Sequence, residues 1–219
     1  MKKYFLQLIA LFAMALLGEA IFFYSLSTNK VLSKVKPKTT TSTVVYIHES
    51  AAMQKNDLPL INELKKQKYS IISYDLPTKK TATFEVAVTE WTKDLNKLVG
   101  NKKVIVIGHS LGGSVATHFC SIDKRCIAGV NLDGVPAFDE KLSIPFLYLQ
   151  TEKNMICDAS CKQGRALMTK IASGSGKAEV KILGAATYNA TNSAIKDDQE
   201  IINKQIIAFL QKTINKKSK

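Results

Sequence analysis

The sequence predicts an α/β protein, a three-layer α/β/α sandwich with a mostly parallel sheet of about six strands. Two observations support this expectation. Short apolar segments rich in valine and isoleucine alternate with amphipathic segments of helical period along most of the chain, which is typical of strands joined by crossover helices. Most of the strand-like segments are apolar at nearly every position rather than at every second one, which indicates a sheet covered on both faces.

The elements are expected in strict alternation. Short apolar segments, most of them with β-branched residues, predict strands over residues 43–48, 70–75, 103–107, 127–133, 145–150 and 179–183. Apolar residues at helical spacing predict helices over residues 56–68, 84–98, 111–122 and 162–171. Asp197 and Asp198 are expected to cap a closing helix, whose inward side chains would be Ile201, Ile202, Ile206, Phe209 and Leu210.

One segment joins an apolar strand to a helix through a serine framed by glycines, Gly108-His-Ser110-Leu-Gly112. A serine hydroxyl is a weak nucleophile, and a sharp turn exposes it to a base and to oxyanion donors. Gly108 and Gly112 suit that turn because side chains there would clash with the crossing strand and helix. The segment predicts a nucleophile elbow, with Ser110 as nucleophile and the Leu111 N–H as an oxyanion donor. The alternative is a plain glycine turn.

The chain has 219 residues, which suits one domain with a short extension. Residues 1–26 have a basic start and an apolar core, which predicts a signal peptide or a retained membrane anchor. Residues 27–42 are rich in Lys, Ser and Thr and predict a linker, residues 43–214 the folded domain, and residues 215–219 a basic tail. We expect an exported protein that is periplasmic, extracellular or anchored to the outer face of the inner or plasma membrane.

Positive charge is in excess, because lysine and arginine outnumber aspartate and glutamate by 13. Much of the excess lies near the chain ends, which indicates solvated termini or, alternatively, attraction to an anionic membrane surface. Nucleic acid is not an expected partner, because no binding motif is present and the lysines are not interleaved with aromatic residues. We expect no metal and no cofactor, and a monomer.

The four cysteines form two close pairs, Cys120 with Cys126 and Cys157 with Cys161. In an exported chain an even number predicts disulfides, and local pairing is the simplest of the three connectivities. Buried free thiols are the alternative. A zinc site is disfavoured because the pairs lack nearby histidines and the usual ligand spacing.

Four segments resemble one branch of the α/β hydrolases, the platelet-activating-factor acetylhydrolase and related bacterial lipase-like enzymes. They are Gly108-His-Ser-Leu-Gly-Gly113, Ala128-Gly-Val-Asn-Leu-Asp-Gly134, Pro145-Phe-Leu-Tyr-Leu-Gln-Thr-Glu152 and Lys181-Ile-Leu-Gly-Ala-Ala186. The resemblance implies a compact α/β-hydrolase fold that cleaves carboxylic esters of lipids or short acyl groups. The resemblance also implies that this hydrolysis needs no metal or cofactor.

The resemblance assigns the triad acid to Asp133, at the end of the strand after the elbow strand. A carboxylate there can hold an imidazole in the correct tautomer near the nucleophile. The alternative is a turn-forming aspartate before Gly134. Glu152, at the end of the next strand, is the reserve acid, with an ordinary loop carboxylate as its alternative.

The catalytic base is missing from its expected place. The family carries histidine in a loop of the form Gly-Ala-x-His, and here Gly184-Ala-Ala186 is followed by Thr187. Threonine cannot accept a proton from serine at neutral pH. The second oxyanion donor is expected at Ser50, next to Glu49, which replaces the family's glycine and would oppose a developing negative charge.

Three histidines remain as substitutes for the base. His109 lies inside the elbow, where its side chain is expected to point away from Ser110. His118 is eight residues further along the helix, roughly 12 Å from Ser110. His48 ends the strand beside the elbow strand and alone is placed to approach the nucleophile. The sequence therefore supports two functions, an exported serine hydrolase or a pseudohydrolase that binds a ligand or partner without turnover.

Overall fold

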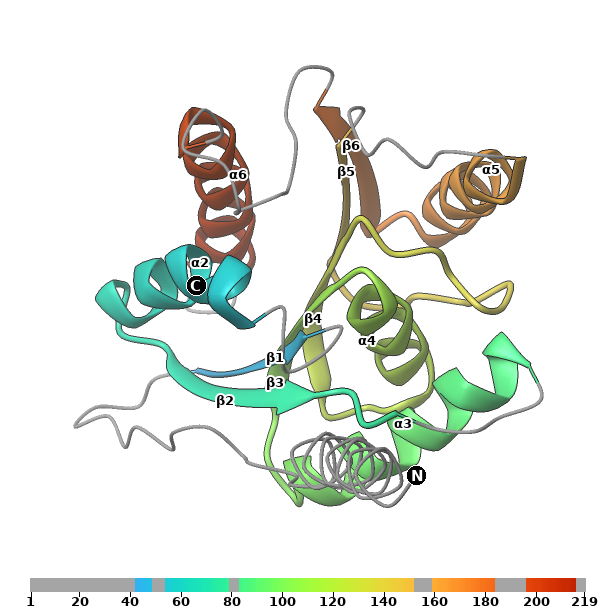
Figure 1. The fold of residues 1–219 in the computed structure, drawn as a ribbon, viewed down its shortest axis with the longest axis horizontal. Coiled ribbons are helices and arrows are strands. Elements are labelled where there is room, and N and C mark those ends of the chain that lie inside the picture. Colours follow the sequence, from blue (N-terminus) through green and yellow to red (C-terminus); the bar gives the residue numbers. More distant parts are fainter. Residues whose placement is uncertain (1–41, 49–53, 79–82, 152–158, 184–195, 216–219) are drawn as a thin grey trace, which may run out of the picture.

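The computed structural model describes residues 42–48, 54–78, 83–151, 159–183 and 196–215. These residues form one six-stranded sheet in the order β2-β1-β3-β4-β5-β6, and each neighbouring pair is parallel (Figure 1). The strands are β1 (Thr43–His48), β2 (Ser70–Asp75), β3 (Val104–His109), β4 (Cys126–Leu132), β5 (Phe146–Thr151) and β6 (Ala178–Leu183). The parallel sheet expected from the sequence is confirmed.

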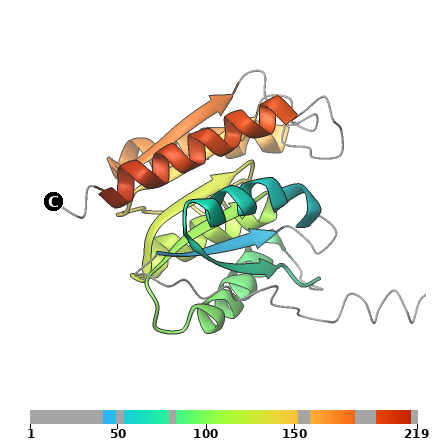
Figure 2. The same ribbon diagram turned by 90° about the vertical axis from the view of Figure 1, so that its left-hand side faces the viewer.

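Helices cover both faces of the sheet. The described helices are α2 (Gln54–Lys66), α3 (Phe84–Val99), α4 (Leu111–Ile122), α5 (Ala159–Ser175) and α6 (Lys196–Asn215). One apolar cluster joins α3, α4 and α5 to one face, and a second joins α2 and α6 to the other (Figures 1 and 2). The molecule is therefore the three-layer α/β/α sandwich that the sequence predicts.

The first strand shows why the strands in the middle of the sheet are apolar at nearly every position. Val45 and Ile47 belong to the cluster under α3 and α4, whereas Val44 and Tyr46 belong to the cluster under α2 and α6. All four side chains have no exposed surface. Successive strand residues point to opposite faces, so a strand with two buried faces needs apolar side chains at every position.

Several helix limits differ from the prediction. α2 begins at Gln54, so Pro59 lies in its second turn and removes one intrahelical hydrogen bond. α6 begins at Lys196, so Asp198 lies in its first turn, where a carboxylate still favours the positive end of the helix dipole. Ile201 is 45% exposed and was wrongly expected to face inward. The buried face of α6 follows Ile202 and Ile206, and Ile201 lies about 100° away from Ile202 around the helix.

A disulfide joins Cys120, near the end of α4, to Cys126, the first residue of β4. This confirms one of the two predicted bridges. Cys157 lies outside the described residues, as does the side chain of Cys161. Because Phe119 and Cys120 pack into the core, the bridge fixes the end of α4 over the sheet.

The predicted export segment and nearly all of the linker lie outside the described residues, as does the tail after residue 215. Within the part of the chain that is described, none of the helices has the length and hydropathy of a transmembrane segment. The same part holds no group of three or more histidine, cysteine, aspartate or glutamate side chains arranged as metal ligands.

Candidate active site

Ser110 occupies a sharp turn between strand β3 and helix α4. Its backbone has φ 53° and ψ −122°, in the left-handed half of the map that a residue with a side chain rarely enters. The Ser110 N–H donates to the Leu132 carbonyl at 2.8 Å, which fixes the turn to the neighbouring strand β4. Leu111 begins α4, so its N–H has no acceptor within the helix and is available to a ligand.

The turn requires glycine where its two arms cross. A Cβ on Gly108 would lie 1.9 Å from the Gly112 carbonyl oxygen, and one on Gly112 would lie 2.3 Å from the Ile47 carbonyl oxygen. Both obstacles are backbone atoms, so no side-chain rotation would relieve the clash. This close packing of strand against helix is the geometry that the glycines of the sequence segment predict.

Asp133 lies beside Ser110 at the carboxyl edge of the sheet. His109 of β3 is paired with Leu132 of β4, so the residues that follow, Ser110 and Asp133, leave the sheet at the same level. Asp133 also has a positive φ, 54°, which aspartate tolerates better than most residues. A Cβ on Gly134 would lie 2.4 Å from the Ser110 carbonyl oxygen, so the two turns are packed together.

The Asp133 carboxylate is held by one residue of strand β5. Its Oδ1 accepts a hydrogen bond from the Thr151 N–H at 2.6 Å, and its Oδ2 accepts one from Thr151 Oγ1 at 2.7 Å. Arg165 of α5 donates through Nη2 to the Thr151 carbonyl at 3.3 Å and places a positive charge near the carboxylate. Sequence reasoning missed both residues, because neither belongs to a local motif.

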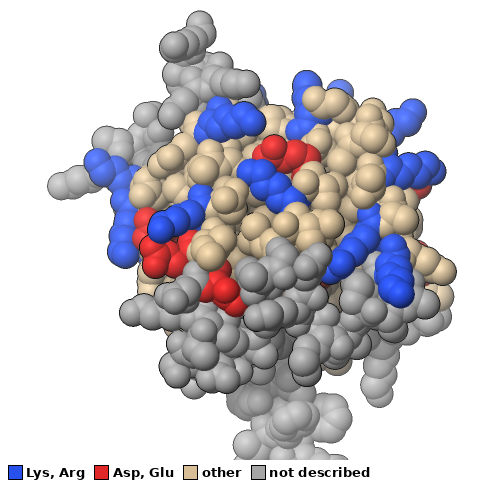
Figure 3. Space-filling view, turned by 90° about the horizontal axis from the view of Figure 1, so that it is seen from above, with Lys and Arg blue, Asp and Glu red and all other residues tan. Residues whose placement is uncertain are grey.

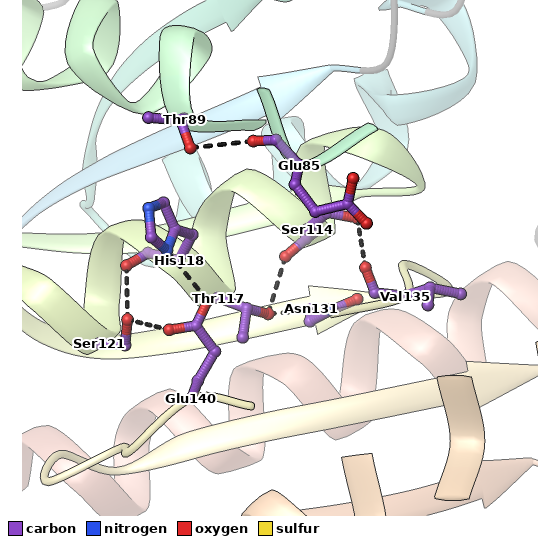
Figure 4. A network of polar contacts seen from close by, with 10 residues as sticks. Glu85, Thr89, Ser114, Thr117, His118, Ser121, Asn131, Val135 and Glu140 are labelled. Carbon is purple, nitrogen blue, oxygen red and sulfur yellow. Dashed lines mark hydrogen bonds and ion pairs between the residues drawn. The ribbon is translucent and has the colours of Figure 1, made fainter. Parts of the chain in front are cut away.

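A buried polar network connects helix α4 to the end of strand β4 (Figure 4). Asn131 Oδ1 accepts from the Gly134 N–H at 2.8 Å, and Asn131 Nδ2 donates to Thr117 Oγ1 at 2.9 Å. Thr117 Oγ1 in turn donates to the Gly113 carbonyl at 2.9 Å. The only sequence signal for this network was an asparagine inside an apolar strand, since a buried amide needs partners.

A second contact strengthens the same connection. Ser114, one turn into α4, donates through Oγ to the Val135 carbonyl at 2.6 Å (Figure 4). Gly164 of α5 packs against the same residue, and a Cβ there would lie 2.5 Å from Val135 Cγ1. The segment that carries Asp133 is thus fixed from both α4 and α5.

No histidine among the described residues hydrogen-bonds Ser110 Oγ or the Asp133 carboxylate. His48 Nε2 lies 3.4 Å from Ser73 Oγ on β2, and β1 separates that strand from β3, so the ring points away from the elbow. His118 lies in the second half of α4, and its Nδ1 is 3.0 Å from Glu140 Oε1 (Figure 4). His109 is buried, and a positive charge on its ring would favour ionisation of Asp133.

Burial raises the pKa of the Asp133 carboxyl above its ordinary value, and the hydrogen bonds from Thr151 offset part of that effect. A raised pKa means that the folded state favours the protonated carboxyl of Asp133. The stabilisation from this protonated form is complete below the unfolded-state pKa of about 3.9, and it is lost as the pH rises through the higher pKa of the folded state. Ionised Asp133 is therefore a cost to the folded state at neutral pH, as is common for carboxylates at functional sites.

Asp133→Asn should therefore make the chain more stable than wild type at pH 7. Asparagine keeps the shape, tolerates the positive φ, accepts from the Thr151 N–H and donates to Thr151 Oγ1 without a charge. The difference should shrink near pH 4, where the wild-type carboxyl becomes protonated. Urea unfolding at both pH values measures this difference in the free energy of unfolding. A variant less stable than wild type at pH 7 would contradict this account.

Four residues singled out in the sequence lie outside the described residues: Glu49, Ser50, Glu152 and Thr187. The second oxyanion donor, the reserve acid and the residue at the expected histidine position therefore remain sequence predictions. The structure brings together Ser110, Leu111 and Asp133, which the sequence selected, and adds Thr151, Arg165 and Asn131 around them.

Comparison with known proteins gives matches at the level of family and fold. A family model described as "Alpha/beta hydrolase family" matches residues 50–167. No curated protein matches the chain significantly. An esterase of Pyrococcus furiosus is 16% identical with a TM-score of 0.61, over 87% of this chain and 95% of that one. Est1E from Butyrivibrio proteoclasticus is 11% identical with a TM-score of 0.60, over 82% of this chain and 92% of that one.

Proposed function

The chain belongs to the alpha/beta hydrolase family, and from this premise we propose that it is an exported serine hydrolase acting on carboxylic esters, lipid or short-acyl. The observation that carries the proposal is the backbone of Ser110, held at φ 53° between β3 and α4. Strained backbone of this kind clusters at active sites, and the sharp turn presents the Ser110 side chain between strand and helix. The esterases among the similar folds agree with this substrate class.

In the proposed reaction, Ser110 Oγ bonds to the ester carbonyl carbon, and the bond to the alcohol oxygen breaks. The hydroxyl proton passes through a base to the departing alcohol, and water then releases the acid by the same route. The Leu111 N–H, and by position the Ser50 N–H, would stabilise the oxyanion. Asp133 would orient the base, whose usual place is occupied by Thr187.

The second candidate is a pseudohydrolase, which binds a ligand or partner at this edge of the sheet without turnover. One set of contacts favours it. Within the described residues, His48 is directed to Ser73 and His118 to Glu140, and the Asp133 carboxylate is engaged by Thr151. Neither of these two histidines is therefore directed toward the Ser110 hydroxyl. A triad that lacks one member keeps only part of its rate advantage.

Covalent labelling with a fluorophosphonate tests the proposal, because this probe reports an activated serine whatever the natural substrate is. We expect the full chain to be labelled slowly, with the added mass on Ser110, and Ser110→Ala to remain unlabelled. Circular dichroism confirms that the variant is folded. If the folded wild-type chain carries no label on Ser110, the serine-hydrolase proposal is rejected and the pseudohydrolase is favoured.

Two further parts of the proposal depend on sequence segments. The four segments around Ser110, Asp133, Glu152 and Lys181 support membership of the platelet-activating-factor acetylhydrolase and lipase-like branch. The basic and apolar residues 1–26 support export, and the exported protein would be either released or anchored to the outer face of the membrane. An anchored form, together with the basic linker, would keep the site near lipid esters at an anionic surface.

A further inference from the structure

Strand β6 forms one edge of the sheet. It pairs with β5 alone, and no other described element lies along its second side. In Figure 2 it is the orange arrow at the upper edge of the molecule. An edge strand exposes a row of unpaired N–H and C=O groups, which can pair with a further strand. Proteins usually block such an edge, so its side chains indicate whether pairing is prevented or promoted.

The side chains of β6 are divided between its two faces. Lys181 points to the α6 face, because its Nζ donates to Gln205 Oε1 at 3.0 Å. Glu179 lies two residues away and so points to the same face. Val180 packs against the opposite cluster, with α5, and Ile182 shares that face with 52% of its surface exposed. The α6 face of β6 thus carries Glu179 and Lys181 together with Leu183, and the opposite face carries Ala178, Val180 and Ile182.

This pattern is complementary to itself when a second copy of β6 is placed antiparallel, with Val180 opposite the partner's Val180. On one face, Glu179 then lies opposite the partner's Lys181, and Lys181 opposite the partner's Glu179. On the other face, the exposed Ile182 lies opposite the partner's Ala178, and the two valines meet at the centre. Residues directly opposite have Cβ atoms about 5 Å apart, close enough for ion pairs and apolar contact.

We propose that two copies of the chain dimerise through antiparallel pairing of β6 with β6, which joins two six-stranded sheets into one. This differs from the monomer expected from the sequence. Glu179 supports it, because among the described residues no ion pair is formed by this carboxylate within its own chain. Seen from above (Figure 3), basic side chains are spread over the described surface, and acidic and basic side chains lie side by side near its middle.

Charge exchange at the two facing positions tests the proposal. In Glu179→Lys, lysine would face lysine twice, and in Lys181→Glu, glutamate would face glutamate twice. Sedimentation equilibrium of the full chain should show wild type approaching twice the chain mass as its concentration rises. Each variant should dimerise at least about tenfold more weakly, because like charges directly opposite repel. An equimolar mixture of the two variants should restore the wild-type affinity, as should the double exchange in one chain.

Lys103→Glu is the matched control, since it reverses one exposed charge before β3 and should leave the dimer unchanged. The mixture separates edge pairing from association through the apolar residues 1–26, which would not depend on the charges at 179 and 181. A wild type that stays monomeric at every concentration would overturn the proposal. So would a dimer that tolerates both single reversals, or a mixture of folded variants that fails to recover.

Discussion

Thr187→His is expected to raise the rate of hydrolysis of p-nitrophenyl acetate by at least about 100-fold, because a positioned base contributes 10²–10⁴-fold. Thr187 occupies the position where the family that the sequence resembles carries its histidine, and Ser110 and Asp133 already lie together at the edge of the sheet. The gained rate should increase with pH through about 6.5, as imidazole loses its proton. Initial rates between pH 5 and pH 8 measure both effects.

Two controls distinguish a new base from a nonspecific effect of the substitution. Thr187→Asn is also polar but cannot act as a base, so its rate should equal that of wild type. Adding Ser110→Ala to the histidine variant should remove the gain. If the histidine variant is folded and no faster, the site lacks more than its base. Glu49 in the expected oxyanion loop is then the next residue to replace, and the binding module is favoured.

Gly108→Ala is expected to lower the free energy of unfolding by about 3–5 kcal/mol, a large share of the 5–15 kcal/mol of a typical domain. The new Cβ would lie 1.9 Å from the Gly112 carbonyl oxygen, so strand β3 and helix α4 would have to separate. That movement would disturb the apolar contacts of α4, including Val115 and Phe119, which are fully buried. Urea unfolding followed by circular dichroism measures the loss.

Gly174→Ala is the matched control, because it adds the same methyl group where no atom lies within 4 Å. Gly174 lies in helix α5, and alanine is the better helix former, so this variant should gain up to about 1 kcal/mol. If Gly108→Ala were as stable as wild type, the close crossing of strand and helix would not be a constraint on this fold, and the structural basis of the elbow would be wrong.

The sequence was sufficient for the features that depend on neighbouring residues. Short apolar segments located every described strand to within a residue or two, and the glycines around Ser110 indicated the turn because their spacing is local. It was insufficient where side chains meet across the fold. Thr151 and Arg165 are 18 and 32 residues from Asp133, and nothing in their own segments marks them.

The histidines show the same limit more sharply. The order of the strands could place His48 near the elbow, since it ends the strand beside β3. Its ring nevertheless turns toward Ser73, on the strand at the other side of β1. A strand's position in a sheet follows from the topology. The direction of a buried polar side chain depends instead on which hydrogen-bond partners lie within its reach. Ile201 was misplaced for a related reason, because neighbouring isoleucines in a helix point about 100° apart.

Helix α4 is attached to strand β4 and to the segment that follows this strand. Ser114 in the first turn of the helix donates to Val135, Thr117 in its middle accepts from Asn131, and Cys120 near its end is joined to Cys126 by the disulfide. These links oppose separate opening of helix and strand, so we expect this unit to be among the last parts of the fold to open. A ligand that binds at Ser110 would meet a preorganised surface and pay little conformational entropy there.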